Sequence, residues 1–535
     1  MTSKKLVKKY KWTVADFFCG AGGFSEGFSR AGVNVIFSLD NWKLATETHL
    51  INLPNCECKH MNILGMDTTE KIDQIVPDTD IIIGSPPCVS FSNSNKSGKS
   101  DKTLGIKLIT QFLKIILHKK TKPNSKLKYW ILENVPNSIK FIKDEYTAKE
   151  LGLSESLPNL VVKCKNILIA SDYGSPQRRK RAIVGDYIIP KKTHINNEIK
   201  LIDILAALGP PLNNNKQVIV DPLFNIELNK ADLTDHFYDS VIPKELWEKA
   251  KKLKTDHGYM GKMEFPDSFN RTSRTIMATE SYCSRESIIF QCEDSSCNYR
   301  APTIRELASI MGFPIDYQFK GSHGNKHKQI GNAVCVQLSS ALANAILEND
   351  NVIRATPNKR EVIKLDGEQK TKLFTTYKIN PRKINAKFKM HIPYLKINQF
   401  RVELDNTESD FVTTFIWKSY LHKGSGKNAL KTQASNSILE QYLTSPLLDK
   451  IKNSLFEHFS VNLDAKLFQE AHCLLSSNSH ITPTEILEKI KEIIDTNILI
   501  DETIEIEDIF PKKLNYPIKI LYGLYCVNYI VNKLN

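Results

Sequence analysis

A cysteine near residue 88 stands where a side chain can act on a ligand. Cys88 follows Pro86 and Pro87, whose fixed backbone stiffens the turn. The run Ile81–Ile83 before them is apolar and β-branched, which is typical of a buried strand. Loop residues at a strand end are more often functional than structural, so we expect Cys88 to act chemically. The alternative is a structural Pro-Pro turn with an ordinary buried thiol.

A glycine-rich turn supplies a second candidate site. The residues Cys19–Gly23 follow a strand-like segment and precede a helical stretch that begins at Phe24. Glycines there let backbone approach a ligand at a helix N-terminus. Asp40 ends the next strand-like segment, the position from which an acid binds ribose hydroxyls in nucleoside-binding sheets. The turn lacks the Lys-Ser/Thr of a phosphate-binding loop, which disfavours nucleotide hydrolysis.

Strand and helix patterns alternate through the first part of the chain. Strands are expected at residues 12–18, 33–40, 80–84, 129–133 and 182–184, with a helix over 104–118. This alternation predicts an α/β fold with a doubly wound sheet, whose ligands bind at the carboxyl ends of the strands. Further helices are expected at 303–311, at 330–347, and after the capping box at 482–485.

Composition narrows the class of partner. The chain has 535 residues, eleven cysteines and a formal net charge of +14, which favours nucleic acid and, second, an anionic membrane surface. We find neither an apolar run of membrane-spanning length nor a signal peptide, so a cytoplasmic location is expected. The cysteines lack the spacing of a zinc or disulfide framework. We therefore expect reduced thiols and no bound metal.

Several motifs occur together in one order. They are the glycine turn 16–23, Pro86-Pro87-Cys88, Glu133-Asn134-Val135, the basic run 177–181, the helical block 300–314, and the Gly-Asn motif 329–334. In order and spacing they resemble the cytosine-C5 DNA methyltransferase family over about residues 12–347. The resemblance implies a Rossmann-like, S-adenosylmethionine-dependent methyltransferase sheet. Because the first motif begins near residue 12, we expect the bacterial restriction-modification type.

The resemblance also implies catalytic roles. Cys88 would be the thiolate that adds to carbon 6 of cytosine, and Glu133 would hold the N3/N4 edge of the base. Arg179 and Arg181 would fix the base and the acid, with Arg181 contacting the carbonyl oxygen, and Gln177 would support the loop. An ordinary strand-end acid and a surface charge cluster are the alternatives for Glu133 and for the arginines.

A cofactor pocket for S-adenosylmethionine, the methyl donor, is implied in the same way. Its expected residues are Phe18, Gly20, Gly22, Gly23, Asp40, Asn41, Asn62, Ile63, Pro86, Leu104, Asn332 and Val334. Asn41 stands where some members carry an aromatic residue, and Asn62 stands where the family usually has an aspartate. An asparagine can still accept a hydrogen bond from the adenine amine through its carbonyl oxygen.

Four segments follow from these patterns. Residues 1–186 are expected to form the catalytic domain, and residues 187–270 a small target-recognition domain in which Lys251, Lys252 and Lys254 are candidate DNA contacts or simply solvated. Residues 271–350 return to the catalytic domain. Residues 351–535 lie beyond the resemblance and are expected to form an additional α+β domain, with auxiliary DNA binding as its candidate role.

The expected function is methylation of carbon 5 of a flipped-out cytosine within a specific double-stranded DNA sequence. The protein would be a monomer and would protect DNA from a separate restriction endonuclease. Three alternatives remain open. They are a transfer-RNA methyltransferase, although the Cys-Phe-Thr of that branch is missing, a fused methyltransferase-endonuclease, and an inert DNA-binding module.

Overall fold

Two compact units make up the chain. The computed structural model describes residues 12–87, 103–255, 262–292, 298–352, 354, 360, 371–374, 381–393, 395–424, 429–459, 463–475, 481–499, 502–511 and 513–534. The first unit comprises residues 1–255 and 263–375, and the second comprises 256–262 and 376–535. Each unit has its own buried core.

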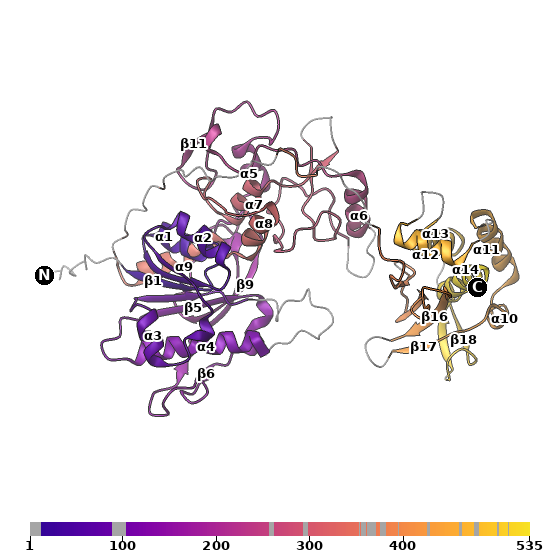
Figure 1. Ribbon diagram of the computed structural model, residues 1–535, viewed down its shortest axis with the longest axis horizontal. Coiled ribbons are helices and arrows are strands. Elements are labelled where there is room, and N and C mark those ends of the chain that lie inside the picture. The colour runs from indigo at the N-terminus through magenta and orange to yellow at the C-terminus, as the bar shows by residue number, and fades with distance from the viewer. Residues whose placement is uncertain are drawn as a thin grey trace. The chain divides into compact units, whose positions relative to one another are not determined.

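A seven-stranded sheet runs through the first unit, in the order β3-β2-β1-β4-β5-β9-β8 (Figure 1). Its strands are β1 Thr13–Phe17, β2 Asn34–Asp40, β3 Glu57–His60, β4 Ile81–Gly84, β5 Tyr129–Asn134, β8 Cys164–Ile169 and β9 Lys180–Asp186. The first five are parallel, whereas β9 and β8 are antiparallel to their neighbours. The five expected strands are confirmed, and the sheet is mixed. A strand was expected to end at 61–63, and β3 ends just before it, at His60, whereas β8 at the other edge was not expected.

Helices cover both faces of this sheet. Residues Ile81 and Ile83 of β4 pack into one apolar core and Ile82 into the other, because side chains alternate along a strand. The helices are α1 Gly23–Ala31, α2 Lys43–Asn52, α3 Thr69–Ile75, α4 Thr103–Thr121 and α9 Val336–Asn349. Figure 1 shows α1 and α9 on one side and α3 and α4 on the other. Burial on both faces explains the run of three isoleucines in β4.

The helical region before residue 350 is interrupted. The helix expected over 303–311 is present as α7 Ile304–Met311. The single helix expected over 330–347 is divided in the structure into α8 His323–Asn332 and α9, with a break at 333–335. Among the described residues, the stretch His323–Asn349 is long and apolar enough to cross a membrane. Two thirds of its apolar window is buried inside the protein, as in a core helix.

The segment after β9 has little regular structure, as its polar sequence predicts. It contains α5 Leu201–Leu208, β10 Val218–Val220, β11 Glu227–Asn229 and α6 Lys244–Thr255. Lys254 is buried and its Nζ lies 3.2 Å from Oδ2 of Asp267, so it is unavailable as a DNA contact and that prediction was wrong. Cys292 is disulfide-bonded, which corrects the expectation that every thiol is reduced.

The second unit has an α+β fold, as expected. An antiparallel sheet contains β14 Lys389–His391, β15 Phe400–Asp405, β16 Lys418–Lys423 and β17 Leu430–Thr432. Helices α11 Ser445–His458, α12 Ala465–Cys473, α13 Pro483–Asn497 and α14 Ile518–Leu534 pack with it around one core. The capping box at Thr482 is confirmed, since its backbone N donates to Oε2 of Glu485 at 2.8 Å.

Candidate active site

An acidic and a basic side chain lie together where β5 ends and β9 begins. Because the two strands are antiparallel, the end of β5 and the start of β9 lie at the same edge of the sheet, with Asn134 paired to Ala182. Oε1 of Glu133 lies 2.8 Å from Nε of Arg181, and both side chains are largely buried. Arg179 and Arg181 were together expected to fix the base and this acid, and in the folded chain Arg181 is the arginine beside Glu133.

A serine holds the other oxygen of the same carboxylate. Ser85 follows β4 directly, and its hydroxyl donates to Oε2 of Glu133 at 2.6 Å. This short distance is typical of a hydrogen bond to a charged acceptor. Glu133 is thus fixed from two sides, by Ser85 on the neighbouring strand end and by Arg181 on the other.

The turn that leads to Cys88 is tied to the same edge. The Asn134 amide donates to the carbonyl oxygen of Pro86 at 3.0 Å, while its own oxygen accepts from the backbone N of Val135. Pro86 is buried and Pro87 is exposed. Cys88 itself lies outside the described residues, so its predicted role stays a prediction.

Arg179 and Gln177 connect backbone segments of the first unit. The Arg179 guanidinium donates to the carbonyl oxygens of Ile276, Gly331 and Ala333 at 3.0, 2.9 and 3.3 Å. The oxygen of the Gln177 side chain accepts from the backbone N of Ile276. Both residues are buried. These contacts connect the segment before β9 to the backbone at Ile276 and at 331–333, and the ion pair to Glu133 comes from Arg181 instead.

The glycine turn and Asp40 form a second part of the edge. The backbone N of Gly20 donates to Oδ2 of Asp40 at 2.9 Å, and the N of Trp42 donates to Oδ1 at 2.7 Å. Burial raises the pKa of Asp40. Gly20 has a φ of +53°, and a Cβ built on it would meet no heavy atom within 4 Å. The turn therefore leaves open space beside a carboxylate at the strand ends.

The other two glycines of the turn face protein atoms. A Cβ on Gly23 would lie 2.4 Å from the carbonyl oxygen of Val334, so this close approach requires glycine. Gly22 packs against Tyr317 and His49. The Gly23 contact fixes α1 against the 333–335 turn, whereas Gly20 alone among these three borders open space.

The remaining predicted cofactor residues are placed as follows. Phe18 follows β1 with a φ of +56°, a strained conformation for a non-glycine residue. The side chains of Asn41, Asn62, Leu104 and Asn332 are exposed, and that of Ile63 is buried in the core. The Asn62 oxygen accepts from the backbone N of Leu64 at 3.0 Å. A carbonyl oxygen has two lone pairs, so it can also accept from a ligand.

These residues fit S-adenosylmethionine. The amino-acid part of the cofactor can bind in the open space at Gly20. The carboxylate of Asp40 has further lone pairs that can accept hydrogen bonds from the ribose hydroxyls. Oδ1 of the buried Asp16, beneath the turn, has no hydrogen-bond partner among the described residues. The donor set is thus suited to a polar ligand with hydroxyl and ammonium groups.

Sequence reasoning missed Ser85 and Asn134 as site residues. Both lie inside motifs that it singled out, directly after β4 and at the end of β5. Their position at strand ends was the available signal. Their partners, Glu133 and Pro86, become visible only once the strands are adjacent.

Named methyltransferases are similar to this chain in sequence. The chain is similar to the type II methyltransferase M1.HphI of Haemophilus parahaemolyticus, with 27% identity over 360 residues that cover 65% of this chain and 89% of that protein. It is also 27% identical over 338 residues to M.SsoII of Shigella sonnei, covering 63% of this chain and 80% of that one.

A solved structure and a family model complete the comparison. The S. pombe Dnmt2 methyltransferase aligns with a TM-score of 0.41 and 18% identity, covering 64% of this chain and 100% of that one. The family model described as C-5 cytosine-specific DNA methylase matches residues 12–348, a span that contains every active-site contact described above. The chain therefore belongs to the C-5 cytosine-specific DNA methylases and is a DNA (cytosine-5-)-methyltransferase.

Proposed function

We propose that the enzyme methylates a flipped-out cytosine within a specific double-stranded DNA sequence by covalent addition of Cys88. The observation that carries this proposal is the Ser85–Glu133–Arg181 arrangement beside the turn that leads to residue 88. Because Ser85 and Arg181 hold the Glu133 carboxyl group in one orientation, it is suited to bind one edge of a single base. The target carbon is unreachable inside a duplex, so the chemistry requires base flipping.

Each catalytic group has a defined step. The Cys88 thiolate forms a bond to carbon 6, and the π-electron pair of the 5–6 double bond moves toward carbon 5. In its protonated form, Glu133 would give N3 a proton and so neutralise the charge that this shift places on the ring. When bound, S-adenosylmethionine would supply the methyl group to carbon 5 and would leave as S-adenosylhomocysteine. Water would then take the proton from carbon 5, the electron pair of that C–H bond would re-form the 5–6 double bond, the thiolate would leave carbon 6, and N3 would return its proton to Glu133.

Arg181 has two tasks in this scheme. Through Nε it holds Glu133, and a guanidinium carries further N–H donors that can contact the carbonyl oxygen of cytosine. Arg179 is a positioning residue, because its guanidinium binds backbone carbonyl oxygens. The cofactor would be held by Gly20 and Asp40, with Phe18 packing against it.

The DNA sequence would be selected by residues 187–270, which separate the arginine motif from the closing motif. Lys251 on α6 is exposed and is a better candidate for a phosphate contact than the buried Lys254. Several similar proteins are named type II methyltransferases, so we propose a restriction-modification role with a separate endonuclease. A monomeric state, a cytoplasmic location and the segment boundaries 1–186, 271–350 and 351–535 also remain predictions.

The test is transfer of labelled methyl groups to unmethylated genomic DNA, with bisulfite sequencing of the product. Methylation at one recurring short sequence, abolished in Cys88→Ser, would support the proposal. Transfer to transfer RNA alone would identify the alternative substrate, and magnesium-dependent cleavage of the DNA would identify a fused endonuclease. No transfer to any nucleic acid would contradict it.

A further inference from the structure

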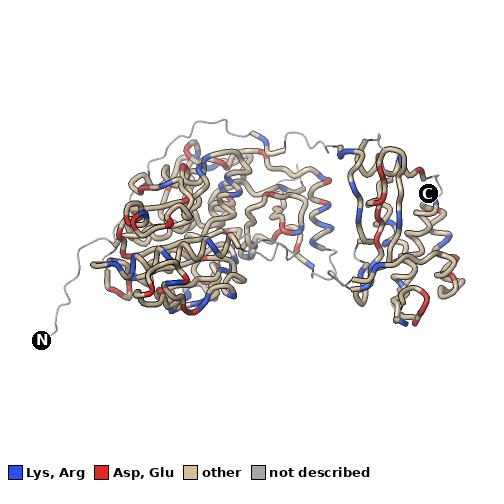
Figure 2. The backbone as a smooth tube through the Cα atoms, turned by 60° about the horizontal axis from the view of Figure 1, so that its bottom comes forward, with Lys and Arg blue, Asp and Glu red and all other residues tan. Residues whose placement is uncertain are grey.

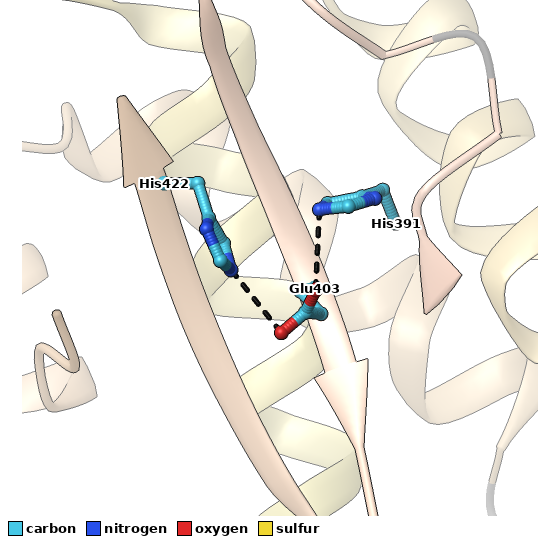
Figure 3. Close-up of side chains that lie close together, drawn as sticks. All are labelled: His391, Glu403 and His422. Atoms are coloured by element: carbon cyan, nitrogen blue, oxygen red, sulfur yellow. Dashed lines mark ion pairs between the residues drawn. The ribbon is translucent and has the colours of Figure 1, made fainter. Parts of the chain in front are cut away.

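We propose that the second unit contains a binding site for a divalent transition-metal ion, formed by His391, Glu403 and His422 (Figure 3). These residues come from the neighbouring strands β14, β15 and β16. His391 is paired directly with Glu403, and His422 is paired with Arg401, two positions from Glu403 on the same strand. Side chains two apart share a face, so all three project from one side of the sheet.

The spacing of the ligand atoms suits a metal. Nε2 of His391 lies 3.3 Å from Oε2 of Glu403, and Nε2 of His422 lies 3.1 Å from Oε1. A tetrahedral zinc site with bonds of about 2.0–2.1 Å has ligand atoms about 3.3 Å apart. All three ligand atoms lie within 4.8 Å of one another. No large rearrangement is therefore needed to place an ion between them.

Unsatisfied polar atoms point into this cluster. Glu403 is 1% exposed and His422 is 7% exposed. Among the described residues, Oε1 of Glu403 and Nε2 of His422 lie 3.1 Å apart without a well-aligned hydrogen bond, although Nζ of Lys431 also lies 3.1 Å from Oε1. Buried polar atoms are normally satisfied, so two unsatisfied atoms that face each other are suited to a shared ligand. The ring of His391 is 38% exposed and gives an ion access from solvent.

Basic side chains compete for the same carboxylate. Nζ of Lys431 lies 3.1 Å from Oε1 of Glu403, and Nζ of Lys389 lies 3.6 Å from it. Figure 2 shows acidic and basic positions side by side along the strands of this unit. Nε of Arg401 donates to Nε2 of His391 at 3.0 Å, so an ion would have to displace the arginine from the lone pair of this nitrogen. The lysine side chains are 32% and 52% exposed and can turn to solvent when an ion binds.

The donor set selects the kind of ion. Two imidazoles and one carboxylate suit zinc and similar divalent ions, and a three-residue site leaves a fourth position for water or a phosphate oxygen. The competing view is an ion-pair network in which Lys431 alone neutralises Glu403. Removal of Lys431 distinguishes the two views. If the cluster binds a metal ion, the lysine competes for Glu403, and its removal should tighten metal binding. If the cluster is an ion-pair network, the lysine is the partner of Glu403, and its removal should not tighten metal binding.

The experiment uses the untagged full-length protein, stripped with a chelator and titrated with Zn²⁺, and separately with Co²⁺ followed by its visible absorption. We expect one equivalent bound in a tetrahedral environment. Glu403→Gln and His422→Ala should each weaken binding at least about 100-fold, the upper end of what removal of an outer-shell partner costs. Lys431→Met should tighten it, and His458→Ala, at an exposed histidine of the same unit, should leave it unchanged.

Three outcomes would overturn the site. They are the absence of saturable one-equivalent binding, binding that Glu403→Gln leaves unchanged, and weaker binding in Lys431→Met. Glu403→Gln keeps the shape of the side chain, so it answers the question even if His422→Ala fails to fold. Because these residues lie outside the family match, methyl transfer is tested independently.

Discussion

Arg360 and Glu26 form a buried ion pair that reaches beyond the family match. Nη2 of Arg360 lies 2.7 Å from Oε2 of Glu26 on α1, and Nη1 lies 2.7 Å from Oδ1 of Asp316. The guanidinium also lies 4.8 Å from the ring centre of Tyr317, whose hydroxyl donates to the carbonyl oxygen of Ala21 in the glycine turn. A residue after position 348 thus supports the turn that would hold the cofactor.

Arg360→Met should destabilise the first unit by about 3 kcal/mol. The substitution leaves Glu26 as a buried carboxylate whose remaining ion-pair partner, among the described residues, is Arg30. Urea unfolding followed by tryptophan fluorescence measures the change. The affinity for S-adenosylmethionine should fall as well, since Tyr317 is then without the guanidinium beside its ring. The double variant Glu26→Gln/Arg360→Met should recover part of the stability.

Arg354→Met is the matched control for that substitution. Arg354 pairs with Glu348 at 2.7 Å, but both side chains are more than half exposed. Exposed pairs contribute about 0–1 kcal/mol, so this variant should unfold almost like the wild type. Equal destabilisation of the two variants would show that the buried position of Arg360 has no special effect.

Ser85→Ala should lower kcat by about 10- to 100-fold, the value of one hydrogen bond to a charged group. The Glu133 carboxylate would keep Arg181 but lose the hydroxyl that fixes its second oxygen. Because Ser85 acts through Glu133, DNA affinity should change little, and single-turnover rates at saturating DNA separate the two effects. Ser154→Ala, on an exposed serine bonded to Ser156, is the control and should retain full activity.

Asp16 should make stability depend on pH. Burial raises its pKa to about 7 in the folded chain, against about 3.9 in the unfolded chain. The folded state therefore holds this proton more strongly, and the contribution to the free energy of unfolding falls as the pH rises from about 4 to about 7. Asp16→Asn removes that dependence.

Urea unfolding of the wild type and of Asp16→Asn at pH 5 and pH 8 measures this difference. The wild type should lose more stability than the variant over this interval, and Glu227→Gln, at an exposed position, should follow the wild type. Equal decreases in the free energy of unfolding of the wild type and of Asp16→Asn would mean that folding does not raise the pKa of this carboxyl group.

The strands that carry the site were predictable, and the edge strands were less so. Residues Ile81–Ile83 are apolar because both faces of β4 are covered, and that pattern survives in the sequence. Strand β3, with Glu57 and Lys59, lies at an edge where solvent replaces one neighbour, so its residues show no such pattern. The break at 333–335 was missed because residues 333–336 are all apolar and contain no proline.

The spacing of motifs along the sequence does not show which side chains contact each other in the folded chain. The motif predicted that an arginine would fix Glu133, yet Arg179 and Arg181 both fitted until the strands were placed. Arg360 reaches Glu26 across more than three hundred residues, and no local pattern marks it. The cluster of His391, Glu403 and His422 was also missed, because antiparallel pairing brings together residues without motif spacing.

Deletion of residues 376–535 should weaken DNA binding and reduce its dependence on salt if the second unit binds phosphates. The slope of log affinity against log salt should become shallower by about 0.9 for each phosphate that this unit neutralises. The deletion must begin after residue 375, the end of the first unit, because an earlier cut would remove Arg360 and destabilise the catalytic fold. Fluorescence anisotropy with labelled duplex DNA at several salt concentrations measures both quantities. An unchanged affinity and slope, with methyl transfer intact, would show that the second unit has a role other than DNA binding.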